Sequence, residues 1–598
     1  MFTALFRRHA LIHDKDGDVA ATQSYQGGDY QGGTFHGVES ARRRSLEVGR
    51  TRLLVTGGMF MLAFSIISAR LVEVSIFKSS EALRHARSTE AAPLHVGRGD
   101  IVDRNGVVLA TSLPTVNLYA EPQDIQDPAE VAKRVVSALP DLPYAEVEAK
   151  LASERSFVYL KRNLTPNQEY SINHLGIPGL SFEKGERRVY PHGPLAAHIV
   201  GMTDIDHHGV AGIEKKFDAR LRSSSAPLAL SIDIRIQNAM REELAKSIED
   251  FQALGGTGLV MDVHTGELVA MVSLPDFNPN GTLTDQNAMF DRATLGVYEM
   301  GSTFKLFTAA AALDLGVANV ESRYDATNPI QIANFSIRDY HALKRWLTVP
   351  EILIHSSNIG AAKMGLDVGT KNLREYLGKF GLLSPASLEL PEVASPLVPN
   401  PWREINTMTV AFGHGMAVTP VQMITGVSAI VNGGTFRPAT VLKREESAIP
   451  AGERVISAET AKKIRWMMRL VVEDGTGAKA EAPGYLVGGK TGTAEKNVSG
   501  HYVRKALLSS FMAAFPIANP KYTVLVIMDE PQGNKSTFGY ATGGWTAAPV
   551  VSRVVARIAP MVGIAPIYDH WPGKGYGGAP EVVPAVARTT DLSGGESE

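Results

Sequence analysis

The pair of residues best suited to chemistry in this sequence is Ser302 and Lys305, at the start of an expected helix. Residues i and i+3 share one helix face, so the Lys305 amine can reach the Ser302 hydroxyl. The apolar residues that follow would bury Lys305, and the helix dipole also disfavours its ammonium form. A neutral amine could take the proton of a nucleophilic serine. The alternative is an ordinary helix with Ser302 as N-cap, although a capping box would place Glu or Gln at position 305.

Two further motifs strengthen the nucleophile interpretation. Ser356-Ser357-Asn358 follows in the chain, and Lys490-Thr491-Gly492-Thr493 comes later. Each motif alone is common by chance. In this order, together with the Ser302–Lys305 pair, they form the set described for penicillin-binding proteins and serine β-lactamases. The sequence therefore predicts a serine acyl-transfer site.

This chemistry gives each motif a role. Ser302 attacks a carbonyl, while Ser356, between two lysines, passes a proton to the leaving amine. Lys490 and Thr493 hold a substrate carboxylate, and the backbone amides of Ser302 and Thr493 form an oxyanion hole. Gly492 lets the substrate backbone lie close to the strand. The predicted catalytic residues are Ser302, Lys305 and Ser356, and the predicted substrate-binding residues are Asn358, Lys490, Thr491, Gly492 and Thr493.

Beyond these motifs, the chain resembles class B penicillin-binding proteins, which are peptidoglycan D,D-transpeptidases. The resemblance extends to about residue 558 and includes the stretches 98–110, 188–198 and 209–214, which belong to the family's non-catalytic pedestal. Met300 replaces the proline of the usual Tyr-Glu-Pro-Gly sequence. The division-specific, FtsI-type branch is indicated by the segments 337–360, 411–423 and 524–531. The elongation-specific branch is the nearest alternative.

The resemblance implies the substrates and partners. Such enzymes acylate the serine with a D-Ala residue of a stem peptide, release the terminal D-Ala, and pass the acyl group to an amine of a neighbouring stem. Their expected partners are stem peptides, lipid-linked precursor glycan, β-lactam antibiotics, an FtsW-type membrane glycosyltransferase and other division proteins. No cofactor, metal or nucleic acid is implied. A β-lactamase, a penicillin sensor or a binding scaffold shares the motifs, but we identify no deacylating glutamate.

The elements around the motifs predict an α+β fold. Apolar strands are expected at 258–263 and 267–272, joined by a hairpin, and strands return after Gly484 beyond a run of helices. We expect an antiparallel sheet packed with helices, as in penicillin-binding and serine β-lactamase-like transpeptidase domains. The predicted organisation is a disordered cytoplasmic tail (1–52), a transmembrane helix (53–76), a dimerisation-type pedestal (77–226), a transpeptidase domain (227–562) and a flexible C-terminal tail (563–598).

Composition limits the remaining functions. The 598 residues carry a formal net charge of −2 and no cysteine. Near-neutral charge argues against a nucleic-acid binder, and the lack of cysteine removes disulfides, thiolate metal sites and a cysteine nucleophile.

One apolar run, 53–69, is of a length to cross a membrane. Arginines at positions 42, 43, 44, 50 and 52 precede it, so the positive-inside rule predicts a cytoplasmic N-terminus. We therefore expect a single-pass protein of the bacterial inner membrane at the division septum, with its catalytic domain in the periplasm.

An ATPase is a second functional class to consider, because residues 484–491 fit the phosphate-binding pattern G-x-x-x-x-G-K-[ST] of P-loop enzymes. A P-loop requires a helix directly after the lysine. Here Gly492, Asn497 and Gly500 do not support a helix, and the next apolar segments lie too close together for a parallel crossover. We predict an antiparallel meander and not an ATPase.

Overall fold

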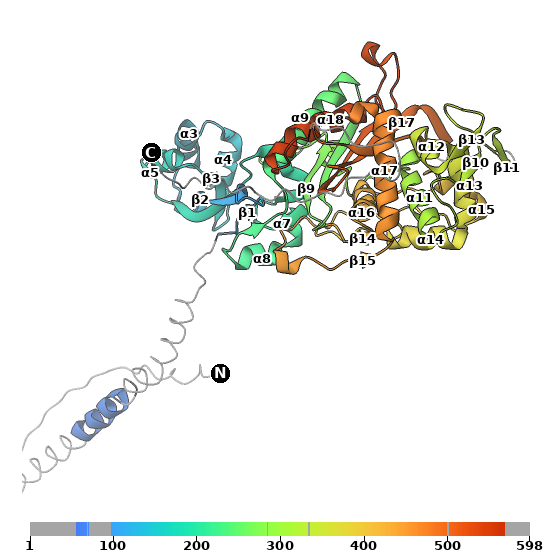
Figure 1. The fold of residues 1–598 in the computed structure, drawn as a ribbon. Coiled ribbons are helices and arrows are strands. Elements are labelled where there is room, and N and C mark those ends of the chain that lie inside the picture. Colours follow the sequence, from blue (N-terminus) through green and yellow to red (C-terminus); the bar gives the residue numbers. More distant parts are fainter. Residues whose placement is uncertain are drawn as a thin grey trace, which may run out of the picture. The chain divides into compact units, whose positions relative to one another are not determined.

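The computed structural model of the chain (Figure 1) forms two units, Met1–His95 and Val96–Glu598, which are described separately. The structure describes residues 56–68, 70, 97–283, 285–332, 335–498 and 501–567.

In the first unit, residues 56–68 form a helix with exposed apolar side chains all round, among them Met59, Phe64 and Ile67. Among the described residues, no helix is both long and apolar enough to cross a membrane. Most of the predicted span 53–76 beyond this helix lies outside the described residues, as do the predicted tail 1–52 and residues 568–598. The anchor and both tails remain predictions.

The second unit begins with a small sheet. Strand β2 (Val108–Ala120) pairs antiparallel with β1 (Ile101–Val102), with β4 (Leu180–Val189) and, at its far end, with β3 (Val158–Leu164). Helices α3 (Pro128–Ala138), α4 (Tyr144–Leu151) and α5 (Pro166–Asn173) supply the rest of its core (Figure 1). The turn between β1 and β2 contains Gly106 at φ 87°, in the left-handed region that favours glycine.

A buried cluster of charged side chains connects this small sheet with the segment that precedes β1 and with helix α7. Glu214 of α7 (Gly212–Lys216) accepts hydrogen bonds from Arg98 Nε at 2.5 Å and Arg188 Nε at 2.7 Å. All three side chains are at most 2% exposed. Arg188 also donates to the backbone carbonyls of Arg98 and Gly99. The cluster thus joins three segments that are far apart in sequence.

The larger sheet has the order β16-β17-β18-β8-β9 and is antiparallel throughout. This confirms the predicted class of antiparallel sheet with helices. The strands alternate between two cores: Val524 and Val526 of β18 face one, while Leu525 and Ile527 face the other. The strands are β8 (Gly255–Asp262), β9 (Leu268–Leu274), β16 (Gly488–Val498), β17 (His501–Phe515) and β18 (Tyr522–Asp529).

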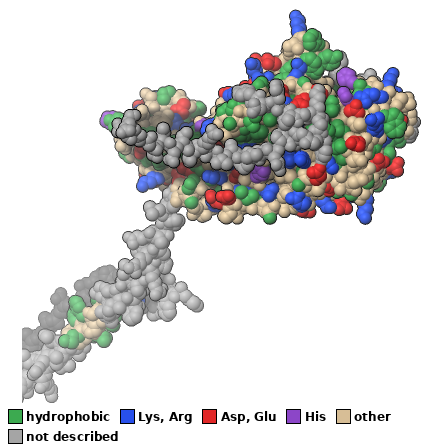
Figure 2. All heavy atoms as spheres, in the orientation of Figure 1, with side chains coloured by type: hydrophobic (Ala, Val, Ile, Leu, Met, Phe, Trp, Pro, Cys, Tyr) green, Lys and Arg blue, Asp and Glu red, His purple; other side chains and the backbone are tan. Residues whose placement is uncertain are grey.

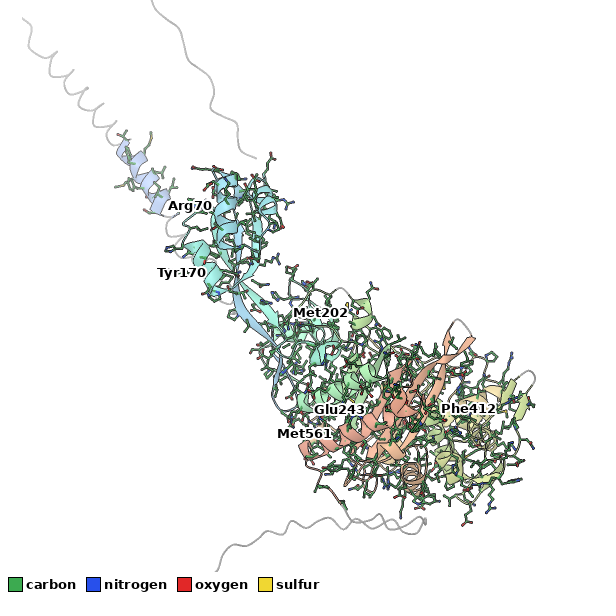
Figure 3. The ribbon with its side chains drawn as sticks, turned by 90° about the horizontal axis from the view of Figure 1, so that it is seen from above. Arg70, Tyr170, Met202, Glu243, Phe412 and Met561 are labelled. Carbon is green, nitrogen blue, oxygen red and sulfur yellow. The ribbon has the colours of Figure 1, made fainter. Side chains whose placement is uncertain are left out.

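Helices α9 (Ile234–Asp250) and α18 (Ala547–Met561) cover one face of this sheet. Glu243 of α9, labelled in Figure 3, accepts from Arg553 and Arg557 of α18, so charge pairing supplements the apolar contact between the two helices. After α18, Ile564 is buried and the Ile567 amide donates to Gly484 O. Ordered chain therefore continues beyond residue 562, where the flexible tail was expected to start, because these residues still pack against the domain.

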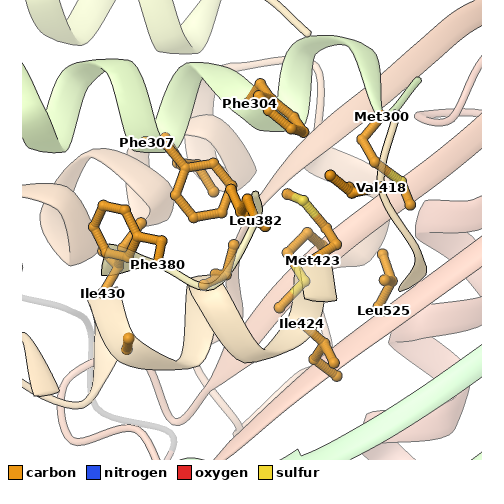
Figure 4. Packing of buried hydrophobic residues seen from close by; sticks show 14 of the residues in the cluster. Met300, Phe304, Phe307, Phe380, Leu382, Val418, Met423, Ile424, Ile430 and Leu525 are labelled. Atoms are coloured by element: carbon orange, nitrogen blue, oxygen red, sulfur yellow. The ribbon is translucent and has the colours of Figure 1, made fainter. Parts of the chain in front are cut away.

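The other face carries the helical layer. Phe304, Phe307 and Phe380 pack with Met423 and Ile424 around α11 and α16 (Figure 4). The helices of this layer are α11 (Lys305–Asp314), α12 (Val349–Ile354), α13 (Asn358–Val368), α14 (Thr370–Lys379), α15 (Glu404–Val410), α16 (Pro420–Val431) and α17 (Ala458–Asp474).

Short elements complete the second unit. The strands are β5 (Met202–Thr203), β6 (Gly209–Ala211), β7 (Leu228–Ala229), β10 (Arg323–Asp325), β11 (Ile330–Ile332), β12 (Phe335–Ile337), β13 (Trp346–Thr348), β14 (Thr435–Phe436) and β15 (Glu453–Arg454). The helices are α6 (Ala197–Val200), α8 (Asp218–Ser223), α10 (Gln286–Met289) and the 3₁₀ turns η2 (Pro122–Asp124), η3 (Gly193–Ala196), η4 (Gly301–Phe304), η5 (Glu446–Ala448), η6 (Ala478–Ala480) and η7 (Lys535–Thr537).

The P-loop alternative is excluded by this topology. Lys490 lies within β16, opposite Met512 of β17, and the strand continues to Val498 with no helix after the lysine. The predicted antiparallel meander is confirmed. On the face seen in Figure 2, basic and acidic side chains intermingle, as the near-neutral net charge suggests.

Candidate active site

The candidate nucleophile lies at the junction of the two layers. Ser302 is in η4, and α11 starts at Lys305. No side chain caps either start, so the N-cap alternative for Ser302 is wrong. Gly301 has φ 53°, and a Cβ there would approach the carbonyl oxygen of Thr493 to 2.8 Å. Glycine thus lets the turn that carries Ser302 lie directly against β16.

Lys305 is completely buried, and its Nζ lies 2.8 Å from Ser302 Oγ. The amine also lies 2.8 Å from the carbonyl oxygen of Ser356 and 2.7 Å from Asn358 Oδ1. Burial, assisted by the charge of Lys490, lowers the pKa of Lys305 well below its ordinary value, and Asp339 opposes this shift. The structure thus favours the neutral form of this amine.

The contacts of a neutral Lys305 amine leave its lone pair for the nucleophile. Such an amine has two N–H donors and one lone pair. The Ser356 carbonyl and Asn358 Oδ1 can only accept hydrogen bonds, so they take the two N–H groups. Of the two hydroxyls that remain, Ser302 Oγ at 2.8 Å is closer than Ser356 Oγ at 3.2 Å, and it can donate to the lone pair. This arrangement is the one a general base needs before it removes the serine proton.

Ser356 connects the two lysines. Its Oγ lies 3.2 Å from Lys305 Nζ and 3.0 Å from Lys490 Nζ. The residue lies between α12 and α13 with φ 59°, in the left-handed region that non-glycine residues rarely adopt. Backbone strain of this kind persists only where the surroundings hold it, and it is frequent at active sites.

Lys490 is as buried as Lys305 but has different neighbours. Besides Ser356 Oγ, its Nζ contacts the carbonyl oxygen and Oγ1 of Thr491, at 3.2 and 3.3 Å. Burial lowers the pKa of Lys490 to about 7. Thr491 in turn shares a 2.8 Å hydroxyl hydrogen bond with Thr476. Lys490 can therefore exchange a proton near neutral pH.

The end of the Lys490 motif faces the nucleophile turn. Thr493 is half-buried, and its Oγ1 accepts from the Gly543 amide at 3.1 Å. At Gly492 a Cβ would meet Ser510 Oγ at 2.2 Å and the Met300 carbonyl at 2.8 Å. Close packing of η4 on β16 thus requires glycine at 492. The expected reason for this glycine was a different one, namely the approach of the substrate backbone.

The eight predicted site residues therefore come together from η4, α11, the α12–α13 junction and β16. Their chemical roles are not tested by geometry alone and remain predictions. Met300, which replaces the usual proline, is buried, and its carbonyl accepts from Thr303 Oγ1 at 2.7 Å. Met300, which departs from the family pattern, is thus part of the packing beneath the nucleophile.

Three neighbouring residues were missed from the sequence. Asp339 contacts the start of α13. Glu299 accepts from the Gly415 amide and the Tyr502 hydroxyl, and burial raises its pKa. Burial also lowers the pKa of His414 to about 4. Asp339 and His414 lie in segments that resemble the FtsI type, and Glu299 lies three residues before Ser302, but none belongs to a motif with its own spacing.

Comparison with family models gives two matches. Residues 256–556 match the model "Penicillin binding protein transpeptidase domain", and residues 93–233 match "Penicillin-binding Protein dimerisation domain". These matches cover the large sheet with its helical layer and the smaller sheet that precedes it.

Curated relatives match over most of the chain. A protein of Caulobacter vibrioides named probable peptidoglycan D,D-transpeptidase FtsI is 40% identical, over 88% of this chain and 92% of its own length. The Escherichia coli K12 peptidoglycan D,D-transpeptidase FtsI is 30% identical, over 86% of this chain and 92% of its own length.

Solved structures share the fold. A Mycobacterium penicillin-binding protein 3, complexed with aztreonam, matches with a TM-score of 0.63 at 24% identity, over 79% of this chain and 97% of that one. The transpeptidase domain of Burkholderia pseudomallei penicillin-binding protein 3 matches with a TM-score of 0.51 at 32% identity, over 56% of this chain and 97% of that one.

Proposed function

This chain belongs to the class B penicillin-binding proteins, and from that premise we propose that it is a serine-type peptidoglycan D,D-transpeptidase that crosslinks stem peptides during cell division. The observation that carries the proposal is the 2.8 Å contact between Ser302 Oγ and the amine of a fully buried lysine, Lys305. Relatives named FtsI support the division role.

Acylation begins at Ser302. The Lys305 amine takes the hydroxyl proton while Ser302 Oγ attacks the carbonyl carbon of the penultimate D-Ala, which gives a tetrahedral oxyanion. The backbone amides of Ser302 and Thr493 are the proposed donors to this oxyanion, and Gly301 packs directly against Thr493. The carbon–nitrogen bond then breaks, and an acyl ester remains on Ser302.

The leaving amine of the terminal D-Ala needs a proton. Ser356 Oγ can give its own proton and take one from Lys490 or Lys305, since it lies within hydrogen-bond distance of both amines. In the second half-reaction, an amine of a neighbouring stem attacks the ester and loses a proton along the same route. This forms the crosslink and returns the Ser302 hydroxyl.

β-Lactams would acylate the same serine, because their ring amide occupies the place of the D-Ala-D-Ala bond. The test is a fluorescent penicillin followed by peptide mass spectrometry. We expect one adduct, on the peptide that contains Ser302, and none in Ser302→Ala. An adduct on another residue, or no adduct on the native protein, would contradict the mechanism.

Turnover separates a transpeptidase from a penicillin sensor or scaffold. We expect the full-length protein to join pentapeptide stems of glycan made from lipid-linked precursor and to release one D-Ala per crosslink. Acylation without crosslinks or D-Ala release would favour a sensor.

The cellular setting is also part of the proposal. Residues 53–76 would anchor the chain in the inner membrane, with the N-terminus in the cytoplasm and the second unit in the periplasm at the septum. The exposed apolar side chains of residues 56–68 support an anchor. An FtsW-type glycosyltransferase is the proposed partner. Midcell fluorescence and co-purification with that partner are expected, while uniform sidewall fluorescence would favour an elongation role.

A further inference from the structure

Asp339 lies in the loop between β12 and β13, yet its carboxylate binds the first residues of α13. Oδ2 accepts from Ser357 Oγ at 2.8 Å. Oδ1 accepts from the backbone amides of Asn358 at 2.6 Å and Ile359 at 3.0 Å. Three donors at the N-terminus of one helix thus converge on a single carboxylate from a distant loop.

The same loop sets the direction of the Asn358 side chain. Asn358 Nδ2 donates to the carbonyl oxygen of Arg338 at 3.0 Å. Because a carbonyl can only accept, the amide nitrogen faces Arg338 and Oδ1 faces the opposite way, 2.7 Å from Lys305 Nζ. Residues 338–339 thus hold Asn358 by its backbone and by its side chain.

We propose that Asp339 is a positioning residue for acyl transfer, which holds the start of α13 so that Ser356 and Asn358 remain in contact with the Lys305 amine. The inference rests on the proposed function. Ser356 needs such support, because its backbone is in the left-handed region and keeps this conformation only when its surroundings hold it. Asp339 supplies that support to the residues directly after it.

Asp339 also acts on Lys305 through its charge. It is the group that raises the pKa of Lys305, against burial and Lys490 on β16. The other titratable group that interacts with Lys305 is His414, after α15, which is neutral above a pH of about 4. Removal of the Asp339 charge therefore lets Lys305 lose its proton at a lower pH. A merely structural role would leave that pH unchanged.

The experiment compares Asp339→Asn and Asp339→Glu with a matched control, Asp314→Asn. Asp314 accepts from the Ser457 amide and the Thr460 hydroxyl at the start of α17, and from the Tyr376 hydroxyl. It therefore has the same type of contacts as Asp339, without contact to a site residue. The measurements are the second-order rate constant for acylation by a fluorescent penicillin between pH 4.5 and 9, and the melting temperature.

We expect Asp339→Asn to slow acylation by about 10- to 100-fold, since small misplacements of catalytic groups have effects of this size. The acid limb of its pH profile should move to lower pH. Asp339→Glu should keep the native acid limb and lose part of the rate, and Asp314→Asn should keep both. If Asp339→Asn does not fold, Asp339→Glu decides by the same criterion.

The proposal is overturned if the Asp339 variants acylate within about twofold of the native rate with the native acid limb, or if Asp314→Asn slows acylation equally. Failure of the proposed function is seen separately, because the native protein itself then forms no adduct at Ser302. In that case the inference falls with it.

Discussion

The pedestal and the active site bury cations in opposite ways. In the pedestal, Arg98 and Arg188 both contact the carboxylate of Glu214. In the active site, Lys305 and Lys490 are equally buried, but within the described part of the chain their amines contact hydroxyl, carbonyl and amide oxygens and no carboxylate. Arginine stays charged in proteins, whereas a buried lysine without a counter-ion loses its proton easily.

Burial of cations therefore has a structural effect in the pedestal and a chemical effect in the active site. The pedestal pairs each buried charge with an opposite charge, which fixes three chain segments. The active site surrounds Lys305 with neutral hydrogen-bond partners, namely the hydroxyls of Ser302 and Ser356, the Ser356 carbonyl and Asn358 Oδ1. The same type of burial therefore yields a rigid joint in one region and, in the proposed mechanism, a base in the other.

The largest effect is expected when the proposed base, Lys305, is removed. Lys305→Met keeps an unbranched chain of similar volume but has no amine, so acylation of Ser302 should fall by about 10³-fold, within the range for general bases. Stopped-flow fluorescence with a labelled penicillin measures the rate, and circular dichroism checks the fold. Acylation of this variant at the native rate would rule out Lys305 as the base.

Loss of the central pedestal carboxylate should act on stability instead. Glu214→Gln leaves the buried Arg188 guanidinium without its carboxylate and Arg98 with only the partly buried Asp218, so the free energy of unfolding should drop by about 3–5 kcal/mol. Urea denaturation measures this change. The remaining folded protein should still acylate Ser302 at close to the native rate, and a selective loss of acylation would contradict the separation of the two regions.

The pH dependence of stability offers a finer test, on Lys490. Its pKa is about 7 in the folded protein and near 10.4 in an unfolded chain. Between these values the unfolded state holds one more proton, so this lysine makes the free energy of unfolding rise by about 1.4 kcal/mol per pH unit. Lys490→Met should lack that contribution between pH 7.5 and 9.5. Parallel slopes for the native protein and the variant would show that Lys490 stays charged.

The smallest effect is expected for an exposed ion pair in the pedestal. Glu146 and Lys150 of α4 are four residues apart, 2.7 Å from each other, and both partly exposed. Glu146→Gln should change the free energy of unfolding by less than about 0.5 kcal/mol, because solvent screens such pairs. A loss as large as that of Glu214→Gln would mean that burial is not what distinguishes the two kinds of pair.

The sequence was informative where a pattern is local. The reach of Lys305 to Ser302 follows from helix spacing, and the P-loop alternative failed because glycines after Lys490 do not form a helix. The short connection between the apolar segments after Lys490 likewise indicated the antiparallel pairing that β17 and β18 show. Each of these features depends on residues only a few positions apart.

Contacts between distant segments could not be predicted in this way. The role of Asp339 depends on a loop that returns to the start of α13, and Gly492 is required by the packing of η4. Neither leaves a periodic signal. The convergence of Arg98 and Arg188 on Glu214 is similar, since it joins positions more than a hundred residues apart along the chain.

The central claim is that burial makes the Lys305 amine a base. The protonation state of this amine tests that claim most directly. Lysine labelled with ¹³C at Cε gives one NMR signal per residue, and Lys305→Met identifies the signal of Lys305 by its absence. A titration from pH 5 to 11 then reports the pKa of this amine. The structure predicts that Lys305 loses its proton well below the ordinary lysine pKa, whereas an amine that remains protonated up to about pH 10, the ordinary lysine value, would contradict it.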